Sequence, residues 1–293
     1  MAEIVSLLYQ FGTNAAFLLL AALGLIVILG MMNIINLAHG EFMMLGAYAA
    51  SATVHRGIPF PLAVVLSATA MGIFGIVLER LVVRHFYGRE LGALVVTWGI
   101  SLILSQGTLI AFGPFMAPIA IPGGALAVGV YSFSTYWLFL IALCALLLGG
   151  LGWLYKATEF GLQARATMQN AAMARALGIR VERVYMITFG IGSALAGLSG
   201  ALLAPTTSIA PFMGQQFVAP AFITVVVGGG SSVIGGAIGS SGLLSLVETP
   251  VSFLMGTFWG SVALLVTALV LIRVLPNGVS SLRLRRRTWG ARG

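Results

Sequence analysis

Residues 11–31 read FGTNAAFLLLAALGLIVILGM and contain no charged side chain. A helix needs about 20 mostly apolar residues to cross the hydrocarbon core of a bilayer, and this segment has that length. It belongs to a longer charge-free stretch that runs from Ile4 to Gly40. We therefore expect the chain to cross a membrane for the first time here.

The rest of the chain repeats this pattern. Further charge-free stretches are residues 57–78, 91–155, 184–247 and 249–272. Of the 293 residues, 59% are apolar and 8% are charged, and the mean hydropathy is +1.06, outside the usual range of soluble domains. Because a bilayer offers the backbone no hydrogen-bond partners, these stretches are predicted to be helices.

The pattern predicts an all-α polytopic membrane protein, with one transmembrane domain over residues 1–293 and about eight transmembrane helices. The expected spans are 11–31, 41–54, 59–78, 91–112, 132–154, 184–204, a broken segment at 218–246, and 251–272. A signal peptide begins with positively charged residues, but Glu3 is the charged residue before the first span, and no Lys or Arg precedes that span. We therefore expect the first span to remain in the mature chain.

Basic side chains gather in three connecting regions, namely residues 80–89, the loop 155–183 and the tail 276–293. The positive-inside rule places all three in the cytoplasm, and it accounts for the net charge of +8 without nucleic acid. Counting crossings back from Arg80 puts the N-terminus outside and leaves the C-terminus cytoplasmic. The uncharged stretches 113–129 and 206–216 are expected to be loops on the opposite face.

The segment 218–246 departs from a simple span. An even number of crossings must separate Arg183 from Arg273 if both are cytoplasmic. The middle of the segment reads Gly228-Gly229-Gly230-Ser231-Ser232, which interrupts a helix. We predict two half-helices that enter and leave by the same face, beside protein or a water-filled cavity. The residues of this break that we expect to line the solute path are Gly228, Gly229, Gly230 and Ser231.

A second set of candidate path residues lies between the first two apolar runs: Asn33, Asn36, His39 and Glu41. Polar groups at such depth are costly, and they face a cavity or one another. Gly40 predicts a local break in the helix. Either the four side chains line a solute path, or Asn36, His39 and Glu41 satisfy one another and cap the second helix. A metal site at His39 is disfavoured, since no cluster of ligands completes it.

The loop 155–183 is long for a connection between helices, which usually takes roughly 2 to 8 residues. Gly178 supplies a stop for a helix in this loop. Five residues fall close to one face of that helix, namely Leu162, Ala166, Gln169, Met173 and Leu177. Such an amphipathic helix either lies on the bilayer surface or docks a partner protein.

Small residues recur at helical spacing, which lets helix backbones approach closely in lipid. Two neighbouring stripes are Gly192, Ala196, Gly200 and Ala204, and Ser193, Gly197 and Ala201. Packing inside the chain is their expected role, and a contact with another chain is the alternative. The single cysteine, Cys144, lies in an apolar run and is expected in the core.

Catalytic signatures are missing from the sequence. It has no Gly-x-Ser-x-Gly, no His-Glu-x-x-His and no Asp. The one lysine, Lys156, is followed by Ala157, so no phosphate-binding Gly-Lys-Ser or Gly-Lys-Thr exists. The chain is predicted to be a non-catalytic transmembrane subunit that binds no cofactor. If transport is driven by ATP, the nucleotide and Mg must bind to other chains.

Three blocks resemble the permeases of branched-chain amino acid ABC importers, specifically the shorter LivH type, over nearly the whole chain. The first and most specific block is NLAHGE at 36–41, followed by MLGAY at 44–48. The second lies in the loop 155–183. The third is VGGG at 227–230 through GGA at 235–237, followed by PNG at 276–278.

The resemblance implies a bacterial inner-membrane heterodimer with a longer homologous permease of the LivM type, two cytoplasmic ATPases and a periplasmic solute-binding protein. Transport would proceed by alternating access, powered by the ATPases. The loop would contact an ATPase and transmit its closure. The residues implied in this coupling are Glu159, Gly161, Arg165, Ala166, Asn170, Ala174 and Gly178.

Branched-chain or other hydrophobic amino acids are the solutes that the resemblance implies. Relatives with the same pattern serve urea, short amides or aromatic acids, and residues 97–104 are similar to a stretch of urea-type permeases. A stand-alone secondary transporter or channel is an alternative of another class. It is motivated by the break at 228–232 and by the polar residues Asn36, His39 and Glu41.

Overall fold

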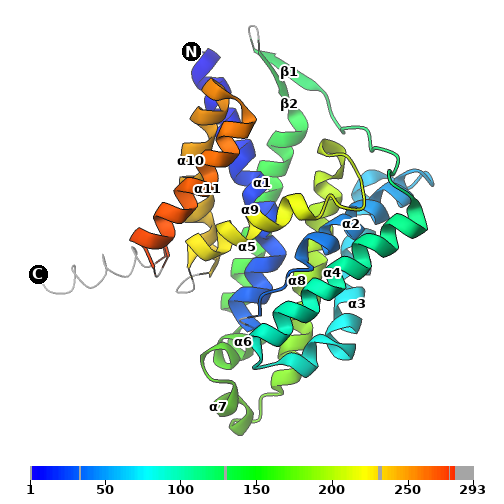
Figure 1. Cartoon of the computed structure of the whole chain (residues 1–293), viewed down its shortest axis with the longest axis vertical. Coiled ribbons are helices and arrows are strands. Elements are labelled where there is room, and N and C mark those ends of the chain that lie inside the picture. The colour runs from blue at the N-terminus through cyan, green and yellow to red at the C-terminus, as the bar shows by residue number, and fades with distance from the viewer. Residues whose placement is uncertain (1, 33, 129–130, 230–232, 277, 281–293) are drawn as a thin grey trace, which may run out of the picture. The chain divides into compact units, whose positions relative to one another are not determined.

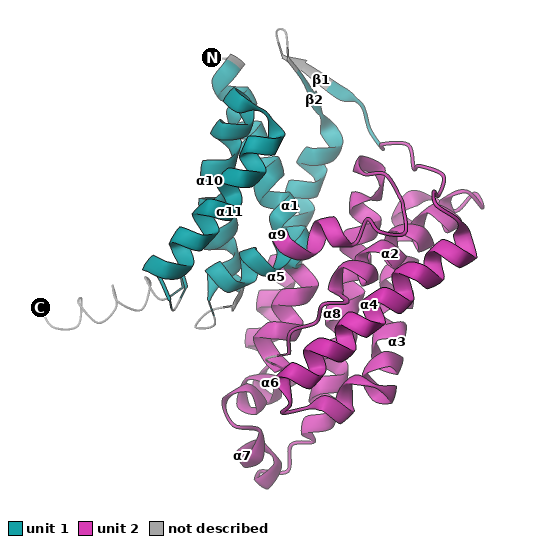
Figure 2. Ribbon diagram, viewed as in Figure 1, with its two compact units in different colours: residues 1–22, 122–147, 220–293 teal, residues 23–121, 148–219 magenta. Residues whose placement is uncertain are grey.

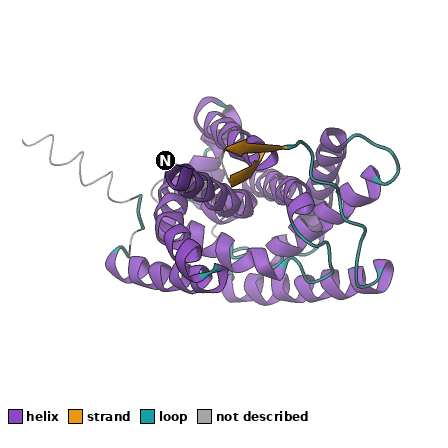
Figure 3. Cartoon of the chain, turned by 90° about the horizontal axis from the view of Figure 1, so that it is seen from above, coloured by secondary structure: helices purple, strands orange, loops and turns teal. Residues whose placement is uncertain are grey.

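The computed structural model describes residues 2–32, 34–128, 131–229, 233–276 and 278–280, and these are mainly helical (Figures 1 and 3). The long helices are α1 (Ala2–Met32), α2 (His39–Val54), α3 (Phe60–Leu81), α4 (Glu90–Phe112), α5 (Thr135–Ala157), α8 (Val181–Leu203), α9 (Gln215–Gly228), α10 (Val233–Met255) and α11 (Thr257–Val274). The shorter ones are α6 (Glu159–Gln169), α7 (Ala171–Ala176) and the 3₁₀ turns η1 (Val83–Phe86) and η2 (Ala204–Thr206).

Seven helices in the described part of the chain are long and apolar enough to cross a membrane: α1, α3, α4, α5, α8, α10 and α11. This confirms the predicted polytopic architecture. The predicted span at 41–54 corresponds to α2, which has 16 residues and a length of about 24 Å. The 14 residues of α9 extend over about 21 Å, so α2 and α9 are both shorter than the roughly 30 Å hydrocarbon core.

The predicted interruption after Gly228 is present, but the segment that follows it is longer than expected. Helix α9 ends at Gly228, Gly229 adopts a φ of 80°, and α10 begins at Val233. With 23 residues, α10 extends over about 34 Å, which is a full span and not a half-helix. Pro250 is accommodated within α10, and the chain turns at Gly256, where φ is 93°. The predicted boundaries at 246 and 251 were therefore wrong.

A small β-hairpin replaces part of the loop that was expected at 113–129 and the start of the span expected at 132. Strands β1 (Ala125–Val128) and β2 (Tyr131–Ser134) pair antiparallel, with Ala125 opposite Ser134 (Figure 3). Helix α5 begins directly after β2 at Thr135, whose hydroxyl donates a hydrogen bond of 2.7 Å to the carbonyl of Gly124. The fifth helix thus starts three residues later than predicted.

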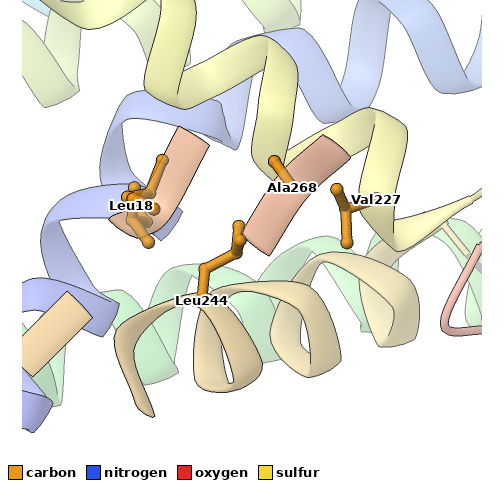
Figure 4. Close-up of a cluster of buried hydrophobic side chains, with 5 residues drawn as sticks. Leu18, Val227, Leu244 and Ala268 are labelled. Atoms are coloured by element: carbon orange, nitrogen blue, oxygen red, sulfur yellow. The ribbon is translucent and has the colours of Figure 1, made fainter. Parts of the chain in front are cut away.

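The chain divides into two compact units (Figure 2). Unit 1 contains residues 1–22, 122–147 and 220–293, and unit 2 contains residues 23–121 and 148–219. In unit 1, α10 and α11 pack against each other, and a buried cluster joins them to α1 and α9 (Figure 4). Its members are Leu18, Val227, Leu244, Leu264 and Ala268.

Unit 2 is built around α8, which packs against both α2 and α3. A Cβ atom added to Gly46 of α2 would collide with the backbone of Gly197 on α8. One added to Gly200 of α8 would collide with the backbone of Met43 on α2. The small residues of α8 therefore pack inside the chain, as expected, and bring the two helix backbones close together.

Gly46→Ala should destabilise the protein, because the added methyl group has no space between α2 and α8. Overpacking of this kind typically costs about 1–3 kcal/mol. Gly107→Ala on α4 is the matched control, since a Cβ atom there meets nothing within 4 Å. Thermal unfolding of the purified protein in detergent should show a lower midpoint for Gly46→Ala alone. Equal midpoints for the two variants would contradict the close approach of α2 and α8.

Candidate functional site

The polar stretch that precedes α2 is irregular at 34–38 and becomes helical at His39. The Asn36 side-chain oxygen accepts a hydrogen bond of 3.0 Å from the backbone N–H of Ala38, which stabilises the turn into α2. Gly40 lies inside the first turn of α2, and its backbone packs against Gly214. The break predicted at Gly40 thus lies a few residues upstream, and Gly40 serves close packing. Asn33 lies outside the described residues.

His39 and Glu41 are buried, at 0% and 1% exposure, but they point in different directions. Two residues apart on a helix, they are separated by about 200° around its axis. The His39 ring lies beside Gly24 of α1, whereas Glu41 accepts a hydrogen bond of 3.3 Å from the Ser105 hydroxyl on α4. The reading in which Asn36, His39 and Glu41 form one mutually satisfied cluster does not describe this arrangement.

Helix α4 presents a buried line of hydroxyl groups to the start of α2, formed by Thr97, Ser101, Ser105 and Thr108. The Thr97 hydroxyl accepts a hydrogen bond of 3.2 Å from the N–H of Leu37 and lies 3.1 Å from the carbonyl of Leu94, its acceptor. This line of hydroxyl groups was not predicted from the sequence. Its signal was the spacing of four, four and three residues between hydroxyls along the apolar segment 91–112.

Several polar atoms of this region have no hydrogen-bond partner among the described residues. They are Asn36 Nδ2, Glu41 Oε2 and Tyr48 Oη, all on buried side chains. Tyr48 lies seven residues after Glu41, on the same face of α2. Unpaired buried polar groups are costly, and a buried carboxylate without a cation is especially so. The α2–α4 seam therefore contains hydrogen-bond donors and acceptors that are not paired among the described residues.

Gly228 and Gly229 belong to unit 1, whereas the α2–α4 seam belongs to unit 2. The carbonyl of Gly228 accepts a hydrogen bond of 3.1 Å from the N–H of Ser280, and a Cβ atom on Gly228 would collide with the backbone of Gly236. The backbone at Gly229 packs against Gly278. These contacts explain the glycines by packing. Gly230 and Ser231 lie outside the described residues.

The loop 155–183 forms two capped helices where one continuous helix was expected. Thr158 caps α6 by accepting a hydrogen bond of 3.1 Å from the N–H of Gly161. Asn170 ends α6 and caps α7, accepting a bond of 3.0 Å from the N–H of Met173. Gly178 adopts a φ of 85° after α7, as its predicted role as a stop requires.

The large apolar side chains of this loop point away from the rest of unit 2. Leu162, Met173 and Leu177 are 63%, 59% and 74% exposed. Small residues form the inner face instead, and they are Gly161, Ala164, Thr167 and Ala174. A Cβ atom on Gly161 would collide with the carbonyls of Leu154 and Tyr155. Arg165 and Ala166 are half-buried. The loop thus presents an exposed apolar surface on a closely packed base.

Two contacts tie neighbouring segments to the start of α8. Arg175 of α7 donates a hydrogen bond of 2.9 Å to Glu182 in an exposed ion pair, a kind worth about 0–1 kcal/mol. The Tyr87 hydroxyl donates to the buried Glu79 carboxylate, and its ring meets Tyr185 edge-on at 4.8 Å. Burial and the Glu79 carboxylate raise the pKa of Tyr87, so it remains a neutral donor.

Among the described residues, no group of three or more His, Cys, Asp or Glu side chains is placed to hold a metal ion. The site is therefore described by hydroxyl, amide and carboxylate groups within helices, together with the exposed apolar surface of α6 and α7.

Comparison with known proteins gives a consistent family. A family model described as "Branched-chain amino acid transport system / permease component" matches residues 7–275. A LivH permease protein of Methanocaldococcus jannaschii is 28% identical, over 90% of this chain and 88% of its own length. The "High-affinity branched-chain amino acid transport system permease protein LivH" of Escherichia coli K12 is 27% identical, over 89% of this chain and 90% of its own.

A relative with a different printed role also matches. The "Autoinducer 2 import system permease protein LsrC" of Escherichia coli K12 is 26% identical, over 90% of this chain and 76% of its own length. No solved structure matches. The chain belongs to the permease component family of branched-chain amino acid transport systems. It is a multi-pass, non-catalytic membrane subunit of an ABC-type transport system, as the sequence predicted.

Thr97→Val should destabilise unit 2, because it keeps the shape of the side chain but removes the acceptor for the partly buried N–H of Leu37. Leaving such a group unpaired costs about 1–3 kcal/mol. The matched control is Thr69→Val on α3, whose exposed hydroxyl bonds only within its own helix. Thermal unfolding in detergent should separate the two variants. If the unfolding midpoint of Thr69→Val falls as far as that of Thr97→Val, the hydrogen bond between Leu37 and Thr97 does not stabilise the protein.

Proposed function

We propose that this chain forms half of the membrane channel of an ABC importer for branched-chain or other hydrophobic amino acids, and that it works by alternating access in the bacterial inner membrane. The observation that carries the proposal is the exposed apolar surface of α6 and α7, centred on Leu162, Met173 and Leu177. Because an exposed patch of this kind marks an interaction site, an ATPase subunit is its natural partner in a family of transport permeases.

The construction of the segment suits force transmission. Both helices begin with side-chain caps at Thr158 and Asn170, and Gly161 packs directly on the carbonyls that end α5. The segment leads through Gly178 into α8, which starts at Val181. A docked ATPase would therefore push on a short, capped element joined to the central helix of unit 2. The residues that we assign to this coupling are Glu159, Gly161, Arg165, Ala166, Asn170, Ala174 and Gly178.

On this proposal the complete importer contains a second, homologous permease of the LivM type, two cytoplasmic ATPase subunits and a periplasmic solute-binding protein. The ATPases bind ATP and Mg, and this chain binds no cofactor. The C-terminus and the loop 155–183 face the cytoplasm, and the N-terminus faces outside. The binding protein selects the solute and delivers it to the outer face of the permease pair.

The α2–α4 seam supplies the polar part of the solute path. Glu41 and Asn36 are buried with unmet hydrogen-bonding capacity, and the hydroxyl line of α4 lies beside them. A zwitterionic amino acid carries both donors and acceptors for such groups. Two full-length LivH relatives support this solute class, whereas LsrC shows that the family also serves another. Urea, short amides and aromatic acids remain the alternative solutes.

A stand-alone transporter or channel is the less favoured alternative, because the backbone of Gly228 packs against Gly236 and its carbonyl accepts a hydrogen bond from the N–H of Ser280. The ABC-type reading rests on the family match and on the exposed surface of α6 and α7.

Leu177→Glu should prevent the ATPase subunits from co-purifying with the permease. A residue that becomes buried at the centre of an interface contributes about 2 kcal/mol or more to binding, so the recovery of ATPase should fall at least about tenfold. The matched control is Leu91→Glu, at a leucine that is 80% exposed outside the segment, compared with 74% for Leu177. Quantitative immunoblotting of affinity-purified complexes measures the ratio. If Leu177→Glu recovers as much ATPase as the wild type, the surface of α6 and α7 is not where the ATPase docks.

Glu41→Ala should lower ATP-dependent leucine uptake at least about tenfold, equivalent to about 1.4 kcal/mol, while the protein still inserts into the membrane. The reason is that the carboxylate is a buried polar group of the seam without a cation partner. Glu3→Ala, at an exposed residue near the N-terminus, should leave uptake unchanged. Uptake into vesicles at matched expression is the measurement. If Glu41→Ala takes up leucine as fast as the wild type, the polar groups of the α2–α4 seam serve packing and not transport.

A further inference from the structure

Helix α10, in unit 1, carries a line of polar residues at membrane depth. Ser241, Ser245, Glu248 and Ser252 follow one another at spacings of four, three and four, so they lie on one face of the helix. Glu248 lies seven residues before the end of α10, or about 10 Å along its axis. A carboxylate at such a depth is a functional candidate by default.

This polar face is turned toward the other helices of unit 1. Thr249 accepts a hydrogen bond of 3.1 Å from the Asn14 side-chain amide on α1. Ser252 packs against Gly260 of α11, and Leu244 lies in the buried cluster with leucines of α1 and α11. The opposite side of α10 exposes large apolar residues, such as Leu246 at 61%. The polar line therefore lies on the inner side of the helix, and lipid or a partner would meet the apolar side.

The groups on this face have unmet bonding capacity. Ser245 is 0% exposed, and its hydroxyl has no hydrogen-bond partner among the described residues. Glu248 is half-buried, and the ion pair found among the described residues is Arg175–Glu182, which leaves Glu248 without a cation. Asn14 donates its N–H to Thr249, so its amide oxygen is available as an acceptor.

All of these free groups accept hydrogen bonds. A carboxylate accepts only, a serine hydroxyl accepts as well as donates, and an amide oxygen accepts. A primary ammonium group has three donors and a positive charge, and its bonds to a carboxylate are among the strong ones. It would offset the cost of a half-buried carboxylate that has no cation beside it. An anion or a hydrocarbon group would neither neutralise the Glu248 carboxylate nor donate a hydrogen bond to it.

We propose that Glu248, Ser245 and Asn14 form a binding site for a primary ammonium group, which the solute carries past α10 during transport. The identification of that group with an amino acid in transit rests on the proposed function. The ammonium chemistry itself does not, because it follows from the acceptors on the inner face of α10. A basic side chain of a partner subunit is the less suitable occupant, since it would have to reach this inner face from the apolar side.

Thiol labelling of the whole importer complex in membranes tests the site. In a Cys144→Ala background, Ser245→Cys is reacted with aminoethyl methanethiosulfonate, which is cationic, and with its anionic sulfonatoethyl analogue of similar size. The reactions are run in the resting state, with ATP, and with ATP and vanadate. Each rate is divided by the rate of the same reagent with a free thiol in water, which removes their intrinsic difference.

We expect the cationic reagent to react at least about tenfold faster, in at least one of the three states. Glu248→Gln should bring the ratio close to one, because it removes the charge and keeps the shape of the side chain. Glu3→Gln removes an exposed charge of the same unit and should leave the ratio unchanged. Equal rates for the two reagents, or a preference that survives Glu248→Gln, would overturn the proposal.

A Ser245→Cys thiol that reacts with neither reagent in any state would also overturn it. Such a result would mean that water never reaches this face, for example because a basic side chain of a partner subunit pairs with Glu248 and fills the space. Labelling and transport can fail separately. If wild-type leucine uptake does not require ATP, the proposed function is wrong, while the charge preference at Ser245→Cys still decides whether the ammonium site exists.

Discussion

Hydrocarbon supplies no hydrogen-bond partners, so every interruption of a helix at membrane depth has to be closed by the protein itself. Two interruptions follow that constraint in the residues that the structure describes around them. Before α2, the N–H of Leu37 bonds to the Thr97 hydroxyl. At the end of α9, the carbonyls of Val227 and Gly228 accept bonds of 2.9 and 3.1 Å from the segment 279–280. Polar residues in the apolar helix α4 therefore have a structural role as well as a proposed functional one.

The same constraint explains why α8 is rich in small residues. Without a hydrophobic driving force between helices in lipid, close backbone packing holds them together. Gly192 meets Gly24 of α1, and Gly197 meets Gly46 of α2. The segment of α6 and α7 leads into α8 at Val181, and α8 packs against α2 through these glycines. On the proposed function, this connects the surface of α6 and α7 to the α2–α4 seam.

The fold was largely predictable from the sequence, and the details that failed have physical causes. Charge-free stretches identify long apolar helices because the bilayer imposes their length and composition. Gly40 was read as a break, but its missing side chain serves a contact with Gly214, which is distant in sequence. The end of α10 was misplaced because Glu248, which separates the charge-free stretches 184–247 and 249–272, lies inside the helix. In the loop 155–183, periodicity placed Leu162, Met173 and Leu177 on one apolar face but assumed one continuous helix. The structure shows two helices, a base of small residues and apolar side chains that point outward.

The acidic residues give the clearest reason to treat α10 as more than a scaffold. Five of the seven lie in the first turn of a helix, where the helix dipole favours a negative charge: Glu3, Glu41, Glu90, Glu159 and Glu182. Glu79 ends α3 and accepts a hydrogen bond from Tyr87. Glu248 lies in the C-terminal third of α10, where the dipole gives it no help, and it has neither a donor nor a cation among the described residues. A carboxylate that the fold does not stabilise is retained at a cost, and a cationic ligand during transport provides the compensation that the resting structure lacks.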